Sequence, residues 1–257
     1  MSLANFRIVI PARIGSTRLP RKPLSMLNGK PMIAHTIENA MQTGARVYVA
    51  TDDPDIAQVA DQIGAGVFMS IEDHNSGTER VAEVARVMRW EDDSIVVNLQ
   101  GDEPTMPAVN IAQVAASLGV SGYEMATLCV RLESEAEHLS PNVVKVVRRE
   151  DGRALYFSRA AIGSADGLWP GGGVDRHVGI YGYRVRTLDV LVNRYQACIE
   201  QNEKLEQLRA LSFGMEIGCY DAIANVGPSV DTVEDLFAAE AWIGANADKS
   251  DDAAGNL

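Results

Sequence analysis

Strand and helix signals alternate through the first half of this 257-residue chain, and this alternation constrains the fold more than any other feature. The predicted strands are Phe6–Pro11, Arg46–Thr51, Val67–Ser70 and Ser94–Leu99. The predicted helices are Met32–Thr43, a segment that Asp53-Pro54 opens and Gly64 closes, Thr78–Trp90 and Ala108–Leu118. Strands that alternate with helices are joined by right-handed crossovers. We therefore expect an α/β protein with a mostly parallel sheet.

The pattern changes in the second half, where the sequence favours antiparallel strands. Val143–Arg149 and Arg153–Phe157 flank Asp151-Gly152, a dipeptide typical of a hairpin turn. His177–Arg184 alternates in the manner of a further strand. Gly163–Asp175 is glycine-rich, and we interpret it as a mobile loop that could serve as a lid. An inserted antiparallel lobe is expected here.

Two helices are predicted near the C-terminus. Glu200–Phe213 has the spacing of a single helix, with Leu205, Leu208 and Leu211 on one stripe that suits core or dimer packing. The segment Thr232-Val-Glu-Asp235 has the pattern of a capping box that starts a helix to about Ile243. The tail from Ala245 is small and acidic, and we expect it to be disordered.

Charge and cysteine content exclude several classes of protein. Asp and Glu number 35 against 23 Lys and Arg, and this net charge of −12 argues against general nucleic-acid binding. The cysteines, at 129, 198 and 219, are odd in number and widely spaced, which suits neither a disulfide framework nor a zinc site. No membrane-length apolar run and no signal-peptide pattern is present. We expect a cytoplasmic protein that binds neither nucleic acid nor a membrane.

A cationic loop follows the first predicted strand. No acidic residue precedes Glu38, whereas six basic residues do, at positions 7, 13, 18, 21, 22 and 30. Gly15, Ser16 and Thr17 can let backbone N–H groups approach phosphate oxygens, which Arg18 and Lys22 can neutralise. The loop matches neither G-x-x-x-x-G-K-[ST] nor G-x-G-x-x-G. It indicates a site for a nucleoside triphosphate of another kind, with a solvated basic turn as the alternative.

Two aspartates are candidates for a magnesium site. Asp102 follows the predicted strand that ends at Leu99, and Asp231 precedes the helix cap Thr232. In proteins, Mg²⁺ is usually held by one or two carboxylates together with substrate phosphates. A turn aspartate and a simple cap are the alternatives. Because ligands bind at the carboxyl ends of parallel strands, the loops at 12–22, 52–53 and 101–104 are expected to converge on one edge of the sheet.

Other candidate residues carry weaker signals. The Ser-Gly turn in His74–Arg80 leads into a helix and could recognise a base or ribose through its backbone, or could serve only as a helix cap. His177 lies on an alternating strand, where a histidine is more often structural. No Ser/His/Asp arrangement, metal-spaced His/Cys cluster or general base stands out, so covalent catalysis is not indicated.

Taken together, these segments resemble the 3-deoxy-manno-octulosonate cytidylyltransferases, the CMP-Kdo synthetases. The resemblance is carried, in the family's order, by IPARIGSTRLPRKPL (10–24), NGKPMI (28–33), VATDD (49–53), DHNSGTER (73–80), VVNLQGDEP (96–104), NVVKVV (142–147), ALYFSRA (154–160), RHVGIYGYR (176–184), EKLEQLRAL (203–211) and VDTVEDL (230–236). Ile14 and Arg21 stand where the family usually has Tyr and Gly, which leaves the path of the phosphate loop open.

The resemblance implies a Rossmann-like nucleotide-diphospho-sugar transferase fold with a smaller antiparallel lobe for dimerisation and sugar binding. It implies a homodimer that uses Mg²⁺ to transfer CMP from CTP to the anomeric hydroxyl of 3-deoxy-D-manno-octulosonate (Kdo), giving CMP-Kdo and pyrophosphate for the lipopolysaccharide inner core. One domain is then expected at 1–244. Its nucleotide-binding part would span about 1–125 and 214–244, its inserted lobe about 126–213, and the disordered tail 245–257.

The resemblance also implies the residues of the site. The expected triphosphate ligands are Arg13, Ser16, Arg18 and Lys22, and the expected cytidine ligands are Ser76, Gly77 and Arg80. The sugar acid is expected on Gln100, Arg159, His177, Tyr181, Glu206 and Gln207, and Mg²⁺ on Asp102 and Asp231. Arg18, Lys22, Asp102 and Asp231 are the predicted catalytic residues.

Three alternatives remain open at this point. The chain could be a cytidylyltransferase for a related sugar acid, such as 8-amino-Kdo or a nonulosonic acid. It could be a non-catalytic nucleotide-binding homologue, although both candidate metal carboxylates are intact. A dehydrogenase is disfavoured because the glycine fingerprint of a dinucleotide fold is missing.

Overall fold

The computed structural model describes residues 6–16, 18–165 and 168–254, and the chain divides into two compact units. Unit 1 comprises residues 1–88, 98–111 and 224–257, and unit 2 comprises residues 89–97 and 112–223. These boundaries differ from the predicted ones at 89–97, 112–125 and 214–223, which belong to unit 2. At 214–223 the reason is that a strand at Ile217–Asp221 pairs with a strand at Met125–Arg131.

Unit 1 is built on parallel strands. β1 (Phe6–Ala12) pairs in parallel with β4 (Arg46–Thr51), which pairs in parallel with β5 (Gly66–Met69). The end of β6 (Ile95–Leu99) also belongs to this unit. The inner strands are almost wholly buried, so their sequences read as apolar runs rather than as alternating ones.

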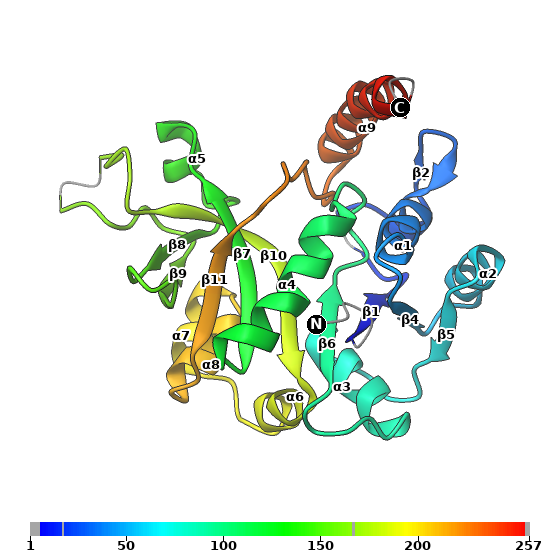
Figure 1. Ribbon diagram of the computed structural model, residues 1–257, viewed down its shortest axis with the longest axis horizontal. Helices are drawn as coiled ribbons and strands as arrows, with labels where there is room; N and C mark the ends of the chain where they lie inside the picture. The colour runs from blue at the N-terminus through cyan, green and yellow to red at the C-terminus, as the bar shows by residue number, and fades with distance from the viewer. Residues whose placement is uncertain (1–5, 17, 166–167, 255–257) are drawn as a thin grey trace. The chain divides into compact units, whose positions relative to one another are not determined.

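Helices cover these strands. The elements between them are the short η1 (Lys22–Leu24), β2 (Met26–Leu27) and β3 (Lys30–Pro31), and the helices α1 (Met32–Met41), α2 (Pro54–Ile63) and α3 (Gly77–Val87). α1 contacts α2, and Figure 1 shows α3 on the opposite side of β1 and β4. Right-handed crossovers produce this arrangement when the chain returns from β5 to the other side of β1.

The ends of α2 show how local chemistry sets a helix. The Asp53 side chain accepts hydrogen bonds from the backbone N–H groups of Asp55 and Ile56, and Pro54 occupies the first helical turn. Gly64 ends the helix in the left-handed region at φ 91°, where a side chain would be strained. Both ends of α2 therefore confirm the sequence prediction.

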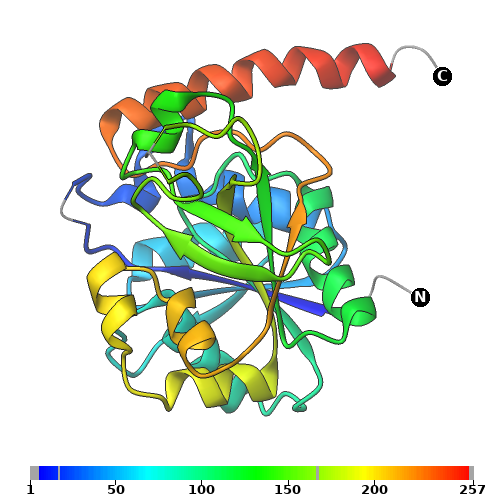
Figure 2. The same cartoon turned by 90° about the vertical axis from the view of Figure 1, so that its left-hand side faces the viewer.

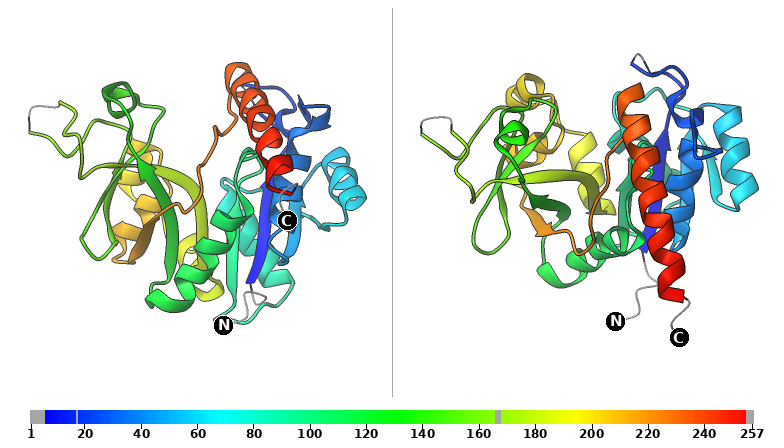
Figure 3. Two further views of the ribbon diagram at one scale, coloured as in Figure 1. Left: turned by 45° about the horizontal axis from the view of Figure 1, so that its top comes forward. Right: turned by 90° about the horizontal axis from the view of Figure 1, so that it is seen from above.

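The last helix of unit 1, α9 (Val233–Ala254), is longer than expected. The predicted capping box forms, because Thr232 Oγ1 accepts from the Asp235 N–H and Asp235 Oδ2 accepts from the Thr232 N–H. The first turns pack against Leu27 and Met32, and Figure 3 shows α9 beside β2 and α1. Residues 245–254, expected to be disordered, continue α9, and they contain no glycine or proline that would interrupt it. Residues 255–257 lie outside the described part.

Unit 2 combines parallel and antiparallel strands. β7 (Met125–Arg131) pairs antiparallel with β10 (Asp175–Arg184) and parallel with β11 (Ile217–Asp221). The predicted hairpin at Asp151-Gly152 is confirmed by β8 (Lys145–Arg148) and β9 (Ala154–Ser158), which Figure 2 shows side by side. Sequence analysis did not predict β7, β11 or the short helices α5 (Glu135–Leu139) and α6 (Val185–Val192). α4 (Ala108–Ser121) begins in unit 1 and continues into unit 2.

The single helix predicted at Glu200–Phe213 is wrong, because the structure has two short helices there. α7 (Cys198–Glu203) and α8 (Gln207–Ser212) are separated at Lys204, which adopts a left-handed conformation at φ 55°. The Glu203 carboxylate, at the end of α7, accepts from Ser158 Oγ at 2.7 Å and from the Arg159 N–H at 2.9 Å. These contacts hold the end of α7 against β9.

Two further features bear on the sequence expectations. The described residues of the expected lid, 163–165 and 168–174, contain neither helix nor strand. Within the described ranges, no helix combines the length and apolar character that crossing a membrane requires.

Candidate functional site

A pocket of about 360 Å³ lies in unit 1, next to the carboxyl ends of β1 and β6. Every residue predicted to bind triphosphate, cytidine or metal lines it: Arg13, Ser16, Arg18, Lys22, Ser76, Gly77, Arg80, Asp102 and Asp231. Gln100, predicted for the sugar acid, lines it as well. Thr17 lies outside the described residues. Because residues from the loops after both β1 and β6 line this one pocket, the expected convergence of these loops is confirmed.

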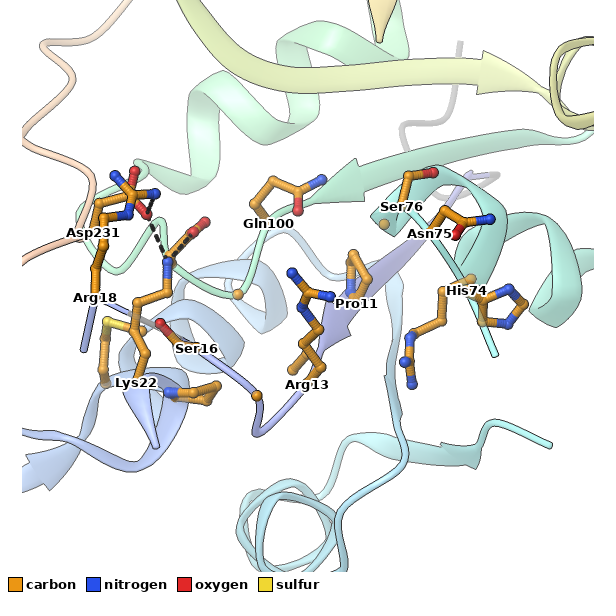
Figure 4. A pocket seen from close by; sticks show the side chains of 18 residues that line it. Pro11, Arg13, Ser16, Arg18, Lys22, His74, Asn75, Ser76, Gln100 and Asp231 are labelled. Carbon is orange, nitrogen blue, oxygen red and sulfur yellow. Dashed lines mark hydrogen bonds and ion pairs between the residues drawn. The ribbon is translucent and has the colours of Figure 1, made fainter. Parts of the chain in front are cut away.

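One end of the pocket holds Asp231, Lys22 and Arg18 (Figure 4), and Asp102 contacts Lys22 there. Lys22 Nζ lies 2.6 Å from Asp102 Oδ2 and 2.9 Å from Asp231 Oδ1. Arg18 Nη2 lies 3.0 Å from the same Asp231 oxygen. A backbone hydrogen bond of 2.9 Å from the Val230 N–H to the Asp102 carbonyl joins the two acidic segments. Carboxylates 129 positions apart in the chain thus converge on one cation.

Opposite charges in this end of the pocket keep Lys22 and Asp231 ionised. Burial by itself would lower the pKa of Lys22, but the attraction and hydrogen bonds of Asp102 and Asp231 outweigh it and raise that pKa. Burial would likewise raise the pKa of Asp231, but Lys22 and Arg18 lower it. Both groups are therefore charged at neutral pH.

Arg21 explains one departure from the family pattern. It adopts φ 53°, the left-handed conformation that glycine tolerates best, at the start of η1. Its guanidinium pairs with Asp55 at 2.5 Å, at the start of α2. The glycine-type backbone of the loop is thus retained here by a residue that carries a charge.

The other end of the pocket is formed by the start of α3 (Figure 4). Ser76 caps this helix, with its Oγ accepting from the Glu79 N–H at 3.2 Å. A Cβ atom placed on Gly77 would lie 3.1 Å from the side chains of Gln100 and Pro11. Glycine therefore fits this helix start without crowding its neighbours.

Two acidic residues that the sequence analysis did not single out for the site hold this end in place. Arg80 donates to Asp52 Oδ2 at 3.0 Å, and Asp52 belongs to the loop after β4 that was expected to converge here. His74 Nε2 lies 2.7 Å from Glu83 Oε2, and both side chains are buried. Burial raises the pKa of Glu83, but hydrogen bonds from His74 and the Ile71 N–H more than offset this and lower it. No signal in the sequence indicated the contact between His74 and Glu83, which are nine positions apart.

Gln100 lies between the two ends (Figure 4). Its Nε2 donates to the buried Asn98 Oδ1 at 3.0 Å. Beside it, a Cβ atom on Gly101 would meet Ile33 at 3.0 Å and the Pro11 carbonyl at 3.2 Å, so a side chain here would be crowded. The backbone of 100–102 therefore fits tightly against β1 and α1.

The other residues predicted for the sugar acid are in unit 2. His177 lies between Phe157 and Tyr181, with ring centroids 5.1 and 5.3 Å away, and burial lowers its pKa to about 3. Arg159 Nε donates to the Glu203 carbonyl and its Nη1 to the Pro141 carbonyl, at 3.1 Å each. Glu206 and Gln207 stand at the start of α8. His177 is therefore neutral, and Arg159 is braced by backbone carbonyls.

One further acidic group occurs among the described residues. Cys129, Asp175 and Asp221, all in unit 2, have potential ligand atoms within 4.8 Å of one another. Arg148 donates to Asp175 at 2.7 Å and to Asp221 at 2.8 Å, so a cation already neutralises both carboxylates. A side-chain hydrogen bond with Cys219, together with burial, raises the pKa of Cys129. We therefore interpret this group as an ion-paired network rather than as the predicted metal site, which consists of Asp102 and Asp231.

The chain is similar to cytidylyltransferases in both sequence and structure. A family model described as cytidylyltransferase matches residues 7–217. The solved structure of CMP:2-keto-3-deoxy-manno-octonic acid synthetase complexed with CTP is 39% identical, with 94% of this chain and 99% of that chain covered and a TM-score of 0.84. A cytidylyltransferase from Leptospira borgpetersenii serovar Hardjo-bovis (strain JB197) is 18% identical, with 94% and 87% covered and a TM-score of 0.58, a likeness of fold alone. The predicted α/β fold class is thereby confirmed.

Proposed function

Because this chain belongs to the cytidylyltransferase family, we propose that it transfers CMP from CTP to the anomeric hydroxyl of Kdo and releases pyrophosphate. The observation that carries the proposal is its likeness, over nearly the whole of both chains, to a CMP:2-keto-3-deoxy-manno-octonic acid synthetase that was solved with CTP. The proposal includes a cytoplasmic homodimer whose product serves lipopolysaccharide inner-core synthesis.

The chemistry explains why the pocket is cationic. The sugar acid and the triphosphate are both anions, and at ~4 Å two unit charges interact by about 4 kcal/mol at an effective dielectric constant near 20. Arg13, Arg18 and Lys22 line one pocket and offset this repulsion. In the reaction, Arg18 and Lys22 stabilise the charge that develops on the departing pyrophosphate.

The two aspartates fit a divalent cation. Asp102 Oδ2 and Asp231 Oδ1 already point at one place, which the Lys22 ammonium occupies. Carboxylate oxygens together with substrate phosphates are the usual ligands of Mg²⁺. We therefore assign Mg²⁺ to Asp102 and Asp231. When bound, Mg²⁺ supplies positive charge at the α-phosphate and makes the attacking sugar hydroxyl more acidic.

The opposite end of the pocket suits the nucleoside. Backbone N–H groups at Ser76 and Gly77 lie at a helix start and can donate to the cytidine, and Arg80 is positioned by Asp52. Arg159, His177, Tyr181, Glu206 and Gln207, together with Gln100, remain our proposal for the sugar acid. Because burial keeps His177 neutral, it would bind sugar hydroxyls as a hydrogen-bonding group rather than as a charge.

A substrate panel tests this function. Pyrophosphate release is measured with CTP, UTP, ATP or GTP against Kdo, 8-amino-Kdo and a nonulosonic acid. We expect turnover to be highest with CTP and Kdo and to require a divalent cation. A preference for another sugar acid would support the related cytidylyltransferase, and CTP binding without any turnover would support a non-catalytic homologue.

The metal assignment has its own control within the same assay. Asp102→Asn should lose turnover at every Mg²⁺ concentration, with unchanged circular dichroism. Asp53→Asn is the matched control, because Asp53 caps α2 outside the pocket and asparagine caps equally well. Near-normal turnover in Asp102→Asn would remove Asp102 from the metal site.

A further inference from the structure

Lys22 occupies the point on which the two proposed metal ligands converge. Its ammonium lies within hydrogen-bonding distance of both carboxylates, and its side chain is only 14% exposed. Arg18 pairs with Asp231 and is 63% exposed. Lys22 is therefore the enclosed counter-ion that both aspartates share in the ligand-free chain.

The proposed metal ion and the Lys22 ammonium cannot occupy the space between the two aspartates at the same time. A Mg²⁺ ion coordinates carboxylate oxygens at about 2.1 Å. The Lys22 ammonium lies 2.6 and 2.9 Å from the same two oxygens, so a divalent ion placed between them would meet a positive charge at contact distance. The ammonium must leave before the ion can bind both aspartates.

The local backbone allows the side chain to move by itself. The Leu24 N–H donates to the Arg21 carbonyl at 2.8 Å and the Ser25 N–H to the Lys22 carbonyl at 3.1 Å, which holds this turn. Pro23 further stiffens the chain next to Lys22. The lysine stem, by contrast, has four rotatable bonds. A swing of the Lys22 side chain is therefore the simplest change that frees the aspartates.

We propose that Lys22 is a displaceable cation that guards the divalent-metal site. In the nucleotide-free protein its ammonium holds Asp102 and Asp231 together. The triphosphate of CTP, an anion of higher charge density, draws the ammonium away and opens the aspartate pair to the metal. This inference rests on the proposed function. It implies that nucleotide and metal bind with positive coupling, each raising the affinity for the other by the same factor.

Metal binding to the nucleotide-free protein tests the proposal without reference to activity. Mn²⁺ binding is titrated by electron paramagnetic resonance for the wild type and for Lys22→Met. Removal of the ammonium takes away the enclosed cation that both carboxylates share and leaves Asp231 with the exposed Arg18. Lys22→Met should therefore bind Mn²⁺ about tenfold or more tightly than the wild type. Lys30→Met is the matched control, since Lys30 pairs with Glu38 outside the pocket and should leave Mn²⁺ affinity unchanged.

The double variant Lys22→Met/Asp102→Asn should lose the gain, which places the ion on this pair. Thermal unfolding gives a second readout: Lys22→Met should unfold at a lower temperature than the wild type and recover when Mn²⁺ is added. If Lys22→Met does not fold, Lys22→Gln is titrated in its place.

Equal Mn²⁺ affinity in the wild type and the Lys22 variant would overturn the displaceable-cation proposal. Should the wild type then still make CMP-Kdo, the proposed function would stand without it. Absence of CMP transfer by the wild type, with the Lys22 effect intact, would end the proposed function and leave a nucleotide-gated metal site.

Discussion

At the scale of single residues, burial and neighbouring charge decide which side chains carry charge. Lys22 stays charged because two carboxylates outweigh the cost of its burial. His177 has no such partner: it contacts Phe157 and Tyr181, and burial leaves it neutral. Desolvation thus favours the neutral form of both groups, but Lys22 stays charged because carboxylates face it, whereas His177 becomes neutral.

His177 should make the protein sensitive to acid. In the unfolded chain it takes up a proton near its ordinary pKa of 6.5, but in the folded chain only near 3. Between these values the unfolded state binds more protons, so stability present above pH 6.5 is lost as pH falls towards 3, by up to about 1.4 kcal/mol per pH unit. Denaturant unfolding between pH 7 and pH 4 should show a shallower decline for His177→Asn. Equal slopes would contradict the neutral state of His177.

At the scale of elements, short capping signals set the boundaries. Asp53 and Gly64 delimit α2, and Thr232 and Asp235 start α9. The break between α7 and α8 has no such signal, because Lys204 is a good helix former that adopts a left-handed conformation here. The contacts of Glu203 with β9 hold the chain in this conformation.

The strain at Lys204 can be relieved by glycine. A residue with a Cβ atom costs roughly 1 kcal/mol or more in the left-handed region, and glycine does not. Lys204→Gly should therefore raise the free energy of unfolding by about 1 kcal/mol. Lys204→Ala, which keeps the Cβ atom, should show no comparable gain. Equal stability of the two variants in urea would show that the backbone at 204 is unstrained.

At the scale of the whole molecule, the residues proposed for the nucleotide and most of those proposed for the sugar acid belong to different units. The residues proposed for the nucleotide and the metal all line the pocket of unit 1. Five of the six residues proposed for the sugar acid belong to unit 2. With a net charge of −12, the chain concentrates positive charge locally, where the anions react, rather than over its surface.

Hydrogen exchange can test this division. CTP with Mg²⁺ should slow amide exchange in peptides that contain Ser16 and Ser76. Kdo added to that complex should then slow exchange in peptides that contain Arg159 and His177. If Kdo slows exchange only in peptides of unit 1, the assignment of these unit 2 residues to the sugar acid is wrong.

The sequence by itself determined the features whose causes lie within a few residues. The alternation of β1, β4, β5 and β6 with helices, the caps of α2 and α9, and the hairpin at Asp151-Gly152 are all local. The meeting of the loops after β1 and β6 was also predictable, because the carboxyl ends of parallel strands share one edge. The individual residues predicted for the nucleotide and the metal came from the family resemblance, and they line this pocket.

Only the tertiary structure decided which groups meet. Lys22 is 80 positions from Asp102 and 209 from Asp231, and nothing in the chain near any of them says that one ammonium neutralises both carboxylates. The neutral state of His177 and the break at Lys204 likewise depend on neighbours supplied by other strands. Local signals act over a turn or two of chain, whereas charge and burial depend on distances in space, which packing alone sets.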